Sequence, residues 1–370
     1  MQISKETLEP FSVDYPVVKL GDPEKLLFLD IETTGFTAKT SSLYMIGCAY
    51  YRDGHWCTIQ WLADNYDEES SVLSSFYQFA NDFEYLVHFN GNQFDIPFLT
   101  QKSQQLGLDD QVRLFERMKG IDLYKRISPC KNFLQLSNCK QRTLEQFLCI
   151  DRTDTFTGGE LIGIYHDYVQ TPSDFSRNSL FLHNEDDLKG MLLILPMLTY
   201  YDIFNDDIRV KKVQANSYRD LNDLTRQEVV MTIALPESLP KPVSLFRMGC
   251  YFKADGDECV LKVPLYVEEM KYFYLNYHDY YYLPEEDVAL HKSIATFVDK
   301  EHRTQATAAT CYTRKASQYL PQWERIFEPV FRREYRSHEI FFELTDDMKR
   351  DRAAFTQYAK HVLSVLGSNY

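Results

Sequence analysis

The sequence predicts an α/β domain in its first half and a smaller α+β domain after it. A short apolar run, residues 26–29, predicts a buried strand, and residues 84–89 predict a second strand; each segment is followed by a turn signal. Apolar residues at helical spacing predict a helix over residues 180–201, with a kink at Pro196. Strands that alternate with helices in this order favour an α/β architecture.

Asp30 and Glu32 follow the first apolar run and lie two positions apart. On a strand both carboxylates leave the same face, and a buried pair of like charges needs a cation or protons to compensate it. The pair therefore indicates either a metal site or two acids satisfied at a strand end. Spacing alone does not decide, since residues 67–69 and 82–84 repeat it in polar stretches that predict a solvated helix surface.

Three further residues are candidates for the same site as this pair. Asp95 begins a predicted helix, where an acid is favoured on electrostatic grounds; taken alone it indicates a helix start, and together with Asp30 and Glu32 it indicates a third ligand. His183 and Asp187 are four residues apart and share a helix face, so that one could bind metal while the other handles a water proton. The alternative for His183 is a surface or capping residue.

These residues form three ordered motifs: Asp30-Ile-Glu32-Thr-Thr-Gly35, Asn90-Gly-Asn-Gln-Phe-Asp95 and His183-Asn-Glu-Asp-Asp187. The set resembles that of the DEDD-type 3′–5′ exonucleases of the ribonuclease H-like superfamily, and is most similar to bacterial YprB-type ribonuclease H-like proteins. The likeness covers about residues 24–203 and extends to the segments 121–123, 142–148 and 157–165. It implies a ribonuclease H-like mixed sheet flanked by helices.

The resemblance also implies roles for the site residues. Asp30, Glu32, Asp95 and Asp187 would hold two divalent cations, Mg²⁺ or Mn²⁺, with Asp30 bridging both and Asp187 on the side of the attacking water. His183 would orient or deprotonate that water. The interval between His183 and Asp187 is the one that the tyrosine subgroup of these enzymes uses, so we expect His183 to matter less for activity than the carboxylates.

Residues around the motifs and in the second half are expected to contact the substrate. Near the carboxylates these are Thr33, Asn90, Asn92 and Phe94. In the second half the densest basic stretch contains Arg332, Arg333 and Arg336, for which the alternative is a solvated surface balanced by nearby glutamates. Aromatic residues between 272 and 282 could stack on bases or fill a sheet core.

Composition and charge limit the possible substrates and the expected cellular location. The chain has 370 residues and a net charge of −14, with 17 basic and 29 acidic residues in 1–204 against 23 and 25 in 205–370. Acidity argues against an ordinary nucleic-acid binder, but bound cations would offset part of it, and we expect a single-stranded nucleic-acid end as substrate. We expect no membrane association, a cytoplasmic location, and eight reduced cysteines without a structural metal cluster.

Three parts are predicted: an N-terminal extension (1–23), the exonuclease domain (24–204) and an α+β domain of unknown role (205–370). The last is expected to begin with a polar connection through 205–207, 210–212 and 222–223. Strands are then predicted at 228–235, 259–267 and 271–275, and helices at 287–298 and 346–366.

The favoured function is a metal-dependent 3′–5′ exonuclease acting on DNA or RNA. The alternatives are a binding module for nucleic acid or protein that keeps the fold without catalysis, and a proofreading-type accessory subunit. Four acids held together have no physical use in a module without catalysis, which favours the enzyme.

Overall fold

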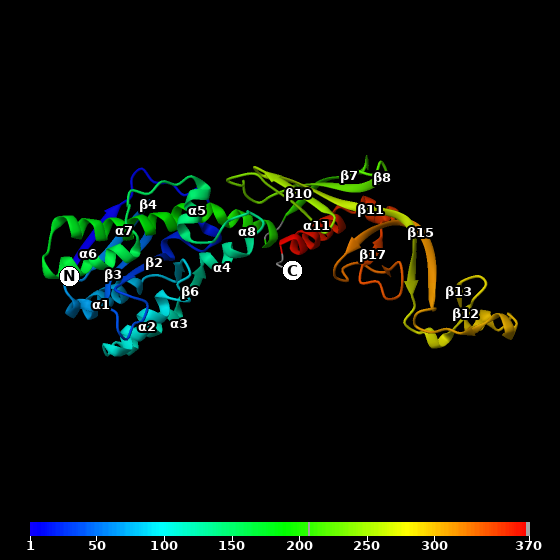
Figure 1. Cartoon of the computed structure of the whole chain (residues 1–370), viewed down its shortest axis with the longest axis horizontal. Helices are drawn as coiled ribbons and strands as arrows, with labels where there is room; N and C mark the ends of the chain where they lie inside the picture. The colour runs from blue at the N-terminus through cyan, green and yellow to red at the C-terminus, as the bar shows by residue number, and fades with distance from the viewer. Residues whose placement is uncertain (206–207, 368–370) are drawn as a thin grey trace. The chain divides into compact units, whose positions relative to one another are not determined.

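The computed structural model describes residues 1–205 and 208–367 of the chain. It divides into two compact units, Met1–Asp202 and Ile203–Tyr370, which run from blue to green and from green to red in Figure 1. The division lies close to the boundary expected at residues 204 and 205. Each unit is described by itself.

A six-stranded mixed sheet forms the centre of the first unit, in the order β1-β4-β3-β2-β5-β6. β2 pairs with β5, and β5 with β6, in parallel, whereas the other neighbours are antiparallel. The strands are β1 (Gln2–Thr7), β2 (Leu26–Thr33), β3 (Leu43–Arg52), β4 (His55–Leu62), β5 (Tyr85–His88) and β6 (Lys119–Asp122). This architecture confirms the predicted mixed sheet of an α/β domain.

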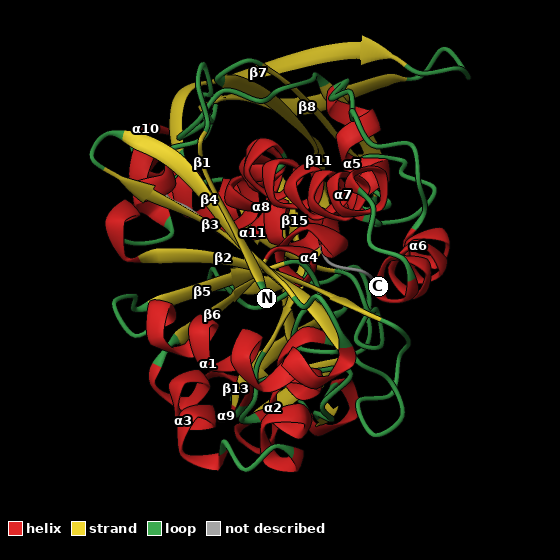
Figure 2. Cartoon of the chain, turned by 90° about the vertical axis from the view of Figure 1, so that its left-hand side faces the viewer, coloured by secondary structure: helices red, strands yellow, loops and turns green. Residues whose placement is uncertain are grey.

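Helices lie on both faces of this sheet, as Figure 2 shows. One face packs against α1, α2 and α3, and the other against α6 and α7. The helices are α1 (Glu69–Ala80), α2 (Asp95–Gln105), α3 (Asp109–Arg117), α4 (Leu123–Ile127), α5 (Gln141–Leu148), α6 (Gly158–Gln170), α7 (Asp174–Leu193) and α8 (Leu198–Asn205). Short 3₁₀ turns lie between β1 and β2 (Val17–Lys19 and Pro23–Lys25), before α1 (Tyr66–Glu68), after α4 (Ser128–Cys130) and between α7 and α8 (Leu195–Met197).

β2 divides its side chains between the two layers of helices. Leu27, Leu29 and Ile31 enter the core that contains α1, α2 and α3. Because side chains alternate along a strand, Asp30 and Glu32 point to the other face, where α7 crosses β2. β5 pairs only with Leu26 to Leu29, so the acidic end of β2 extends beyond its parallel neighbour.

Two sequence predictions for this unit need correction. Residues 1–23 are not a separate extension, because β1 pairs with β4 along its whole length and forms an edge of the sheet. The helix predicted over 180–201 begins earlier, at Asp174, and ends at Leu193. Pro196 then lies in a 3₁₀ turn before α8, since proline removes a backbone donor and clashes with the preceding turn.

The repeated carboxylate spacings also differ from the expected solvated helix surface. Glu69 is the first residue of α1 and is buried. Its carboxylate accepts a hydrogen bond from the backbone N–H of Leu43 and pairs with Lys102. Asp82 and Glu84 are exposed, as expected, but they lie in the turn between α1 and β5.

The second unit is built mainly of antiparallel strands and confirms the predicted α+β class. The longer sheet runs β16-β17-β15-β11-β10-β9, with β8 joining β11 to β7, and a small sheet has the order β13-β12-β14. The strands are β7 (Arg209–Arg219), β8 (Thr225–Ala234), β9 (Val243–Arg247), β10 (Cys250–Asp255), β11 (Glu258–Phe273), β12 (Tyr280–Leu283), β13 (Val288–His291), β14 (Thr304–Gln305), β15 (Tyr312–Gln322), β16 (Val330–Phe331) and β17 (Ile340–Glu343). The helices are α9 (Lys292–Ala295), α10 (Asp346–Arg350) and α11 (Arg352–Gly367), with 3₁₀ turns at Tyr277–Asp279 and Lys300–His302.

Most boundaries in this unit differ from the sequence predictions. The expected polar connection contains β7, which pairs with β8 through its backbone although most of its side chains are exposed. Residues 206 and 207 of that connection lie outside the described residues. The two predicted strands at 259–267 and 271–275 are one strand, β11, because β15 continues the pairing past the intervening acids.

The helix predictions fail for two reasons. Residues 288–291 pair with β12 as a hairpin, so that only the four residues of α9 remain helical in the predicted segment 287–298. The segment 346–366 is divided at Asp351, whose side chain accepts hydrogen bonds from Ala353 and Ala354 and starts a new helix.

Candidate metal centre

Three elements of the first unit bring the predicted carboxylates together. Asp30 and Glu32 lie on β2, Asp95 is the first residue of α2, and Asp187 lies on α7. Burial raises the pKa of Asp30, and the nearby carboxylates of Asp187, Glu32 and Asp95 add to the shift. The structure therefore gathers the whole predicted set.

Burial and mutual repulsion dominate the electrostatics of this cluster. Burial is the largest cause that raises the pKa of Asp30, Glu32 and Asp187. Neighbouring carboxylates add to this shift for Asp30 and Glu32, whereas Arg152 and His183 oppose it for Asp187. Burial also raises the pKa of Asp95 to about 7, although backbone N–H groups of Asp95 and Ile31 oppose this. Within residues 1–205 and 208–367, no lysine or arginine forms an ion pair with Asp30, Glu32 or Asp95. A cation would relieve this excess of buried negative charge.

Asn184 of α7 holds Asp30 in place through contacts with a row of residues across the sheet. Asp30, Gly47 and Gln60 are neighbours on β2, β3 and β4. Asn184 of α7 donates to Asp30 Oδ2 over 2.7 Å and accepts from Gln60 Nε2 over 3.0 Å. A Cβ atom on Gly47 would overlap the Asn184 amide, so glycine is what allows α7 to approach the sheet here.

His183 points into the cluster from α7. Its Nδ1 donates to Asp154 Oδ2 over 2.7 Å, and its Nε2 lies 3.3 Å from Asp187 Oδ2 and 3.7 Å from Glu32 Oε1. Asp154 is buried and also accepts hydrogen bonds from Arg142 and from the Phe156 backbone. The imidazole is therefore held from one side and presents its other nitrogen to the acids.

Arg152 forms an ion pair with one carboxylate oxygen of Asp187. Its guanidinium donates twice to Glu145, at 2.6 and 2.7 Å, and lies 2.7 Å from Asp187 Oδ1. These two acids raise the pKa of Arg152, so it keeps its charge. Gln141 binds both Glu145 Oε1 and the Asp187 backbone oxygen. Asp187 is thus oriented by α5 and by the loop that follows it.

The same loop is anchored by another residue of the third motif. Asp186 accepts hydrogen bonds from the backbone N–H groups of Thr153 and Asp154, at 2.8 and 2.7 Å. His183, Asn184, Asp186 and Asp187 therefore each have a defined contact around the cluster. Sequence reasoning missed Asn184 and Asp186 although both are inside the motif, and it missed Arg152 and Asp154 because their loop has no periodic pattern.

Two buried groups shape the loop that carries the second motif. Asn90 adopts a positive φ of 61°, and its backbone N–H donates to Asp122 of β6. Gly91 donates to His88 Nδ1, and a Cβ atom on Gly91 would overlap the His88 ring. This loop leads directly into Asp95, so His88 and Asp122 help to position that carboxylate.

The predicted substrate residues of the first unit lie beside these acids along the chain. Phe94 immediately precedes Asp95, and its ring lies 6.1 Å from that of Phe36, which is 91% exposed. Asn92 is exposed, while Thr33 donates to the backbone oxygen of Gly35. Sequence reasoning did not single out Phe36, although it follows the first motif directly.

Two of the three predicted basic residues, Arg332 and Arg333, have partners within the second unit. Arg333 pairs with Glu268 and Glu339 and lies over the rings of Tyr266 and Phe341. Arg332 donates to the backbone oxygen of Tyr335, and Arg336 is exposed. These contacts fit the alternative interpretation, a surface stretch balanced by glutamates.

The aromatic residues near the small sheet also pack within their own unit. Tyr274 stacks on Tyr280 at 4.8 Å, and Tyr282 and Tyr312 both donate to Asp287. These contacts favour a core role over base stacking.

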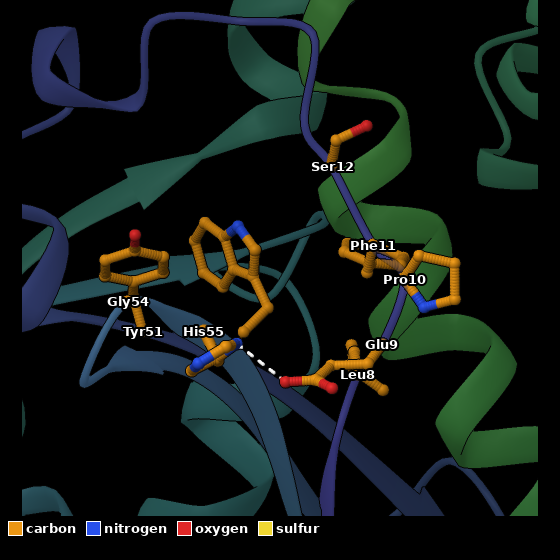
Figure 3. Close-up of a pocket in the computed structure, with 9 residues that line it drawn as sticks. Leu8, Glu9, Pro10, Phe11, Ser12, Tyr51, Gly54 and His55 are labelled. Atoms are coloured by element: carbon orange, nitrogen blue, oxygen red, sulfur yellow. Dashed lines mark ion pairs between the residues drawn. The ribbon is translucent and has the colours of Figure 1, made fainter.

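An open pocket of about 870 Å³ lies elsewhere in the first unit. Figure 3 shows its lining, which includes Tyr51, Phe11 and the ion pair between Glu9 and His55. β3 runs antiparallel to β2, and Tyr51 belongs to the end of β3 that lies beside the start of β2. The pocket is therefore separate from the carboxylate cluster.

A comparison with known families finds a match within the first unit. Residues 27–199 match the family model described as the RNase_H superfamily. The mixed sheet flanked by helices in these residues is consistent with an RNase H-like fold. The match covers all four predicted carboxylates and both faces of the sheet described above. No curated protein matches the chain.

Solved structures show partial likeness to the chain. One is a family B DNA polymerase from the hyperthermophilic archaeon Pyrobaculum calidifontis, at 14% identity and a TM-score of 0.40, covering 74% of this chain and 40% of that one. Another is E. coli exonuclease I in complex with a dT13 oligonucleotide, at 11% identity and a TM-score of 0.28, covering 57% of this chain and 55% of that one. The chain thus spans between two fifths and just over half of these proteins.

The donor atoms of the RNase H-like domain fit divalent cations. Oxygen donors predominate, as Mg²⁺ and Mn²⁺ prefer, and Arg152 beside Asp187 is the one lysine or arginine side chain paired with these acids in the described residues. Glu32, His183 and Asp187 each offer a donor atom within 4.8 Å of the others. Among the described residues, no helix combines the length and apolar character that a membrane span requires.

Proposed function

We propose that the RNase H-like domain hydrolyses phosphodiester bonds of nucleic acid with two divalent cations, Mg²⁺ or Mn²⁺, and removes nucleotides from 3′ ends. The observation that carries this proposal is the cluster of four acids from β2, α2 and α7, of which Asp95 is buried and Asp30, Glu32 and Asp187 are partly buried. Holding them ionised without cations is unfavourable, since burial and repulsion raise their pKa values. Bound cations would stabilise the ionised form of these acids.

In this proposal Asp30, Glu32, Asp95 and Asp187 are the cation ligands. When bound, a pair of divalent ions supplies an activated water and stabilises the departing oxygen of a phosphodiester. Asn184 keeps the Asp30 carboxylate in place, and Arg152 does the same for Asp187. The chain thereby holds its ligands in fixed directions before a substrate arrives.

Features near the acids support a single-stranded end as substrate. Phe36 and Phe94 offer aromatic rings next to the first two motifs, and bases stack on such rings with little regard to sequence. Thr33 at the end of β2, and Asn90 and Asn92 in the loop before α2, supply polar groups beside these rings along the chain. An acidic surface suits a substrate that is held at its end by cations and rings rather than along its backbone.

The test is a degradation assay on 5′-labelled DNA and RNA oligonucleotides with Mg²⁺ or Mn²⁺. We expect a ladder that shortens from the 3′ end of single strands, and no shortening when the 3′ end is blocked by an inverted nucleotide. Asp30→Asn and Asp187→Asn should abolish the ladder while their circular dichroism spectra stay native. If the wild type leaves every DNA and RNA substrate intact with both ions, the enzyme proposal is wrong and a non-catalytic binding module takes its place.

A further inference from the structure

His183 Nε2 is a nitrogen donor inside an otherwise acidic cluster. It lies 3.3 Å from Asp187 Oδ2 and 3.7 Å from Glu32 Oε1, and the three residues offer donor atoms within 4.8 Å of one another. Two ligands that bind one ion at about 2.0–2.2 Å are separated by up to about 4.4 Å. Small side-chain movements therefore suffice for all three to reach a common ion.

The surroundings of this imidazole are those of a metal ligand. His183 is 6% exposed, and in the described part of the chain Nε2 has no recorded partner except the carboxylates of Glu32 and Asp187. Its Nδ1 donates to the buried Asp154, so the lone pair of the neutral ring is on Nε2. Histidines that bind metal usually donate their other N–H to a carboxylate in this way.

Asp187 is arranged to share an ion with His183. Arg152 holds Asp187 Oδ1, which leaves Oδ2 on the side of His183. The two residues are four apart on α7 and therefore share a helix face. The interval that departs from the histidine subgroup of the related exonucleases is the interval that brings both donors to one point.

We propose that Glu32, His183 and Asp187 hold one divalent cation through two carboxylate oxygens and an imidazole nitrogen, and that this site prefers a transition-metal ion such as Mn²⁺ to Mg²⁺. This rests on the proposed function, because the site is one of its two cation sites. It changes His183 from a proton acceptor to a ligand, since one lone pair cannot serve both purposes. Imidazole binds first-row transition metals, whereas Mg²⁺ prefers oxygen and keeps its waters.

Pulsed electron paramagnetic resonance of the Mn²⁺-loaded protein tests the ligand directly. We expect an electron spin echo modulation from ¹⁴N in the wild type and its loss in His183→Asn. His166→Asn is the matched control, since His166 is an exposed histidine of α6 that contacts Tyr66, and it should keep the modulation. The wild-type spectrum remains decisive even where a variant fails to fold.

Competition between ions tests the preference. Displacement of Mn²⁺ by Mg²⁺, followed by the free Mn²⁺ signal, should show that the wild type favours Mn²⁺, and His183→Asn should reduce this preference about 10-fold. Asp154→Asn should weaken Mn²⁺ binding by about 10-fold or more while the ¹⁴N modulation persists at saturation.

The outcomes separate the two proposals. Saturable Mn²⁺ binding without ¹⁴N modulation would overturn the assignment of His183 and leave the proposed nuclease intact. An unchanged ion preference in a folded His183→Asn variant would have the same meaning. Absence of any saturable Mn²⁺ binding would overturn both.

Discussion

Carboxylates with the same two-residue spacing occur at the end of β2 and at the start of α1, and their surroundings differ. Glu69 of α1 is buried, but Lys102 lies 3.1 Å from it and the Leu43 backbone donates to it. Asp30 and Glu32 of β2 are surrounded mainly by other acids. A buried acid beside a lysine contributes to the fold, whereas buried acids that face one another are positioned for a cation.

The largest expected effect separates the two regions by activity. Glu32→Gln removes a charge that cations need, so we expect cleavage to fall by at least about 10³-fold. The same change relieves repulsion in the cation-free protein, and its melting temperature in EDTA should equal or exceed that of the wild type. Melting and cleavage measured on the same preparation check both parts; a lower melting temperature with full cleavage would reverse the assignment.

Glu69→Gln should show the opposite pattern. Glutamine can still accept from Leu43, but Lys102 loses its partner in a buried setting, at a cost of about 3 kcal/mol in the free energy of unfolding. Urea denaturation measures this cost. Cleavage should continue under conditions where the variant is folded, and its loss there would mean that Glu69 belongs to the active machinery.

The pH dependence of stability should also differ from that of a paired acid. Burial raises the pKa of Asp95 from 3.8 to about 7, so the folded state binds more protons than the unfolded state between these values. Without cations, the free energy of unfolding should therefore fall as the pH rises from about 4 to about 7, by up to roughly 3 kcal/mol from this group. Asp95→Asn should lack this component. Parallel curves for both proteins in EDTA would contradict the shift.

The smallest effect concerns the approach of α7 to the sheet. Alanine at Gly47 would push against Asn184 and weaken its hold on Asp30, with a cost of about 1–3 kcal/mol and reduced cleavage. Gly163→Ala on α6 is the control, since a Cβ atom there meets no other atom within 4 Å. Equal stability and cleavage for both variants would show that the Gly47 contact is unimportant.

The sequence was sufficient for β2 and for the start of α2, because an apolar run and turn signals mark them, and for the existence of α7, although not for its bounds. It was insufficient where contacts join distant segments. Arg152 and Asp154 act through a loop without any periodic pattern, and the role of Asn184 depends on Gly47 and Gln60 in neighbouring strands. The sequence predicted a solvated Glu69, but the residue is buried. Its ion-pair partner Lys102 lies 33 residues away in the sequence, so no local pattern indicates the burial.

The second unit was predicted less well for a related reason. Its strands are held by backbone pairing between segments far apart in the sequence, as in β7 with β8 and β11 with β15. Most side chains of β7 are exposed, so its sequence lacks the apolar pattern that would predict a strand. The acids within β11 interrupt the apolar pattern of that strand, which was therefore predicted as two. Sequence periodicity indicates which side chains are buried, but it does not indicate which strands pair through their backbones.

The central claim, that the acids at the end of β2 are held for cations, is tested most directly by calorimetric titration with Mn²⁺. We predict two ions per chain for the wild type and for Glu69→Gln, and the loss of at least one in Asp30→Asn. A wild type that shows no saturable heat, or an Asp30→Asn variant that binds as the wild type does, would contradict the claim.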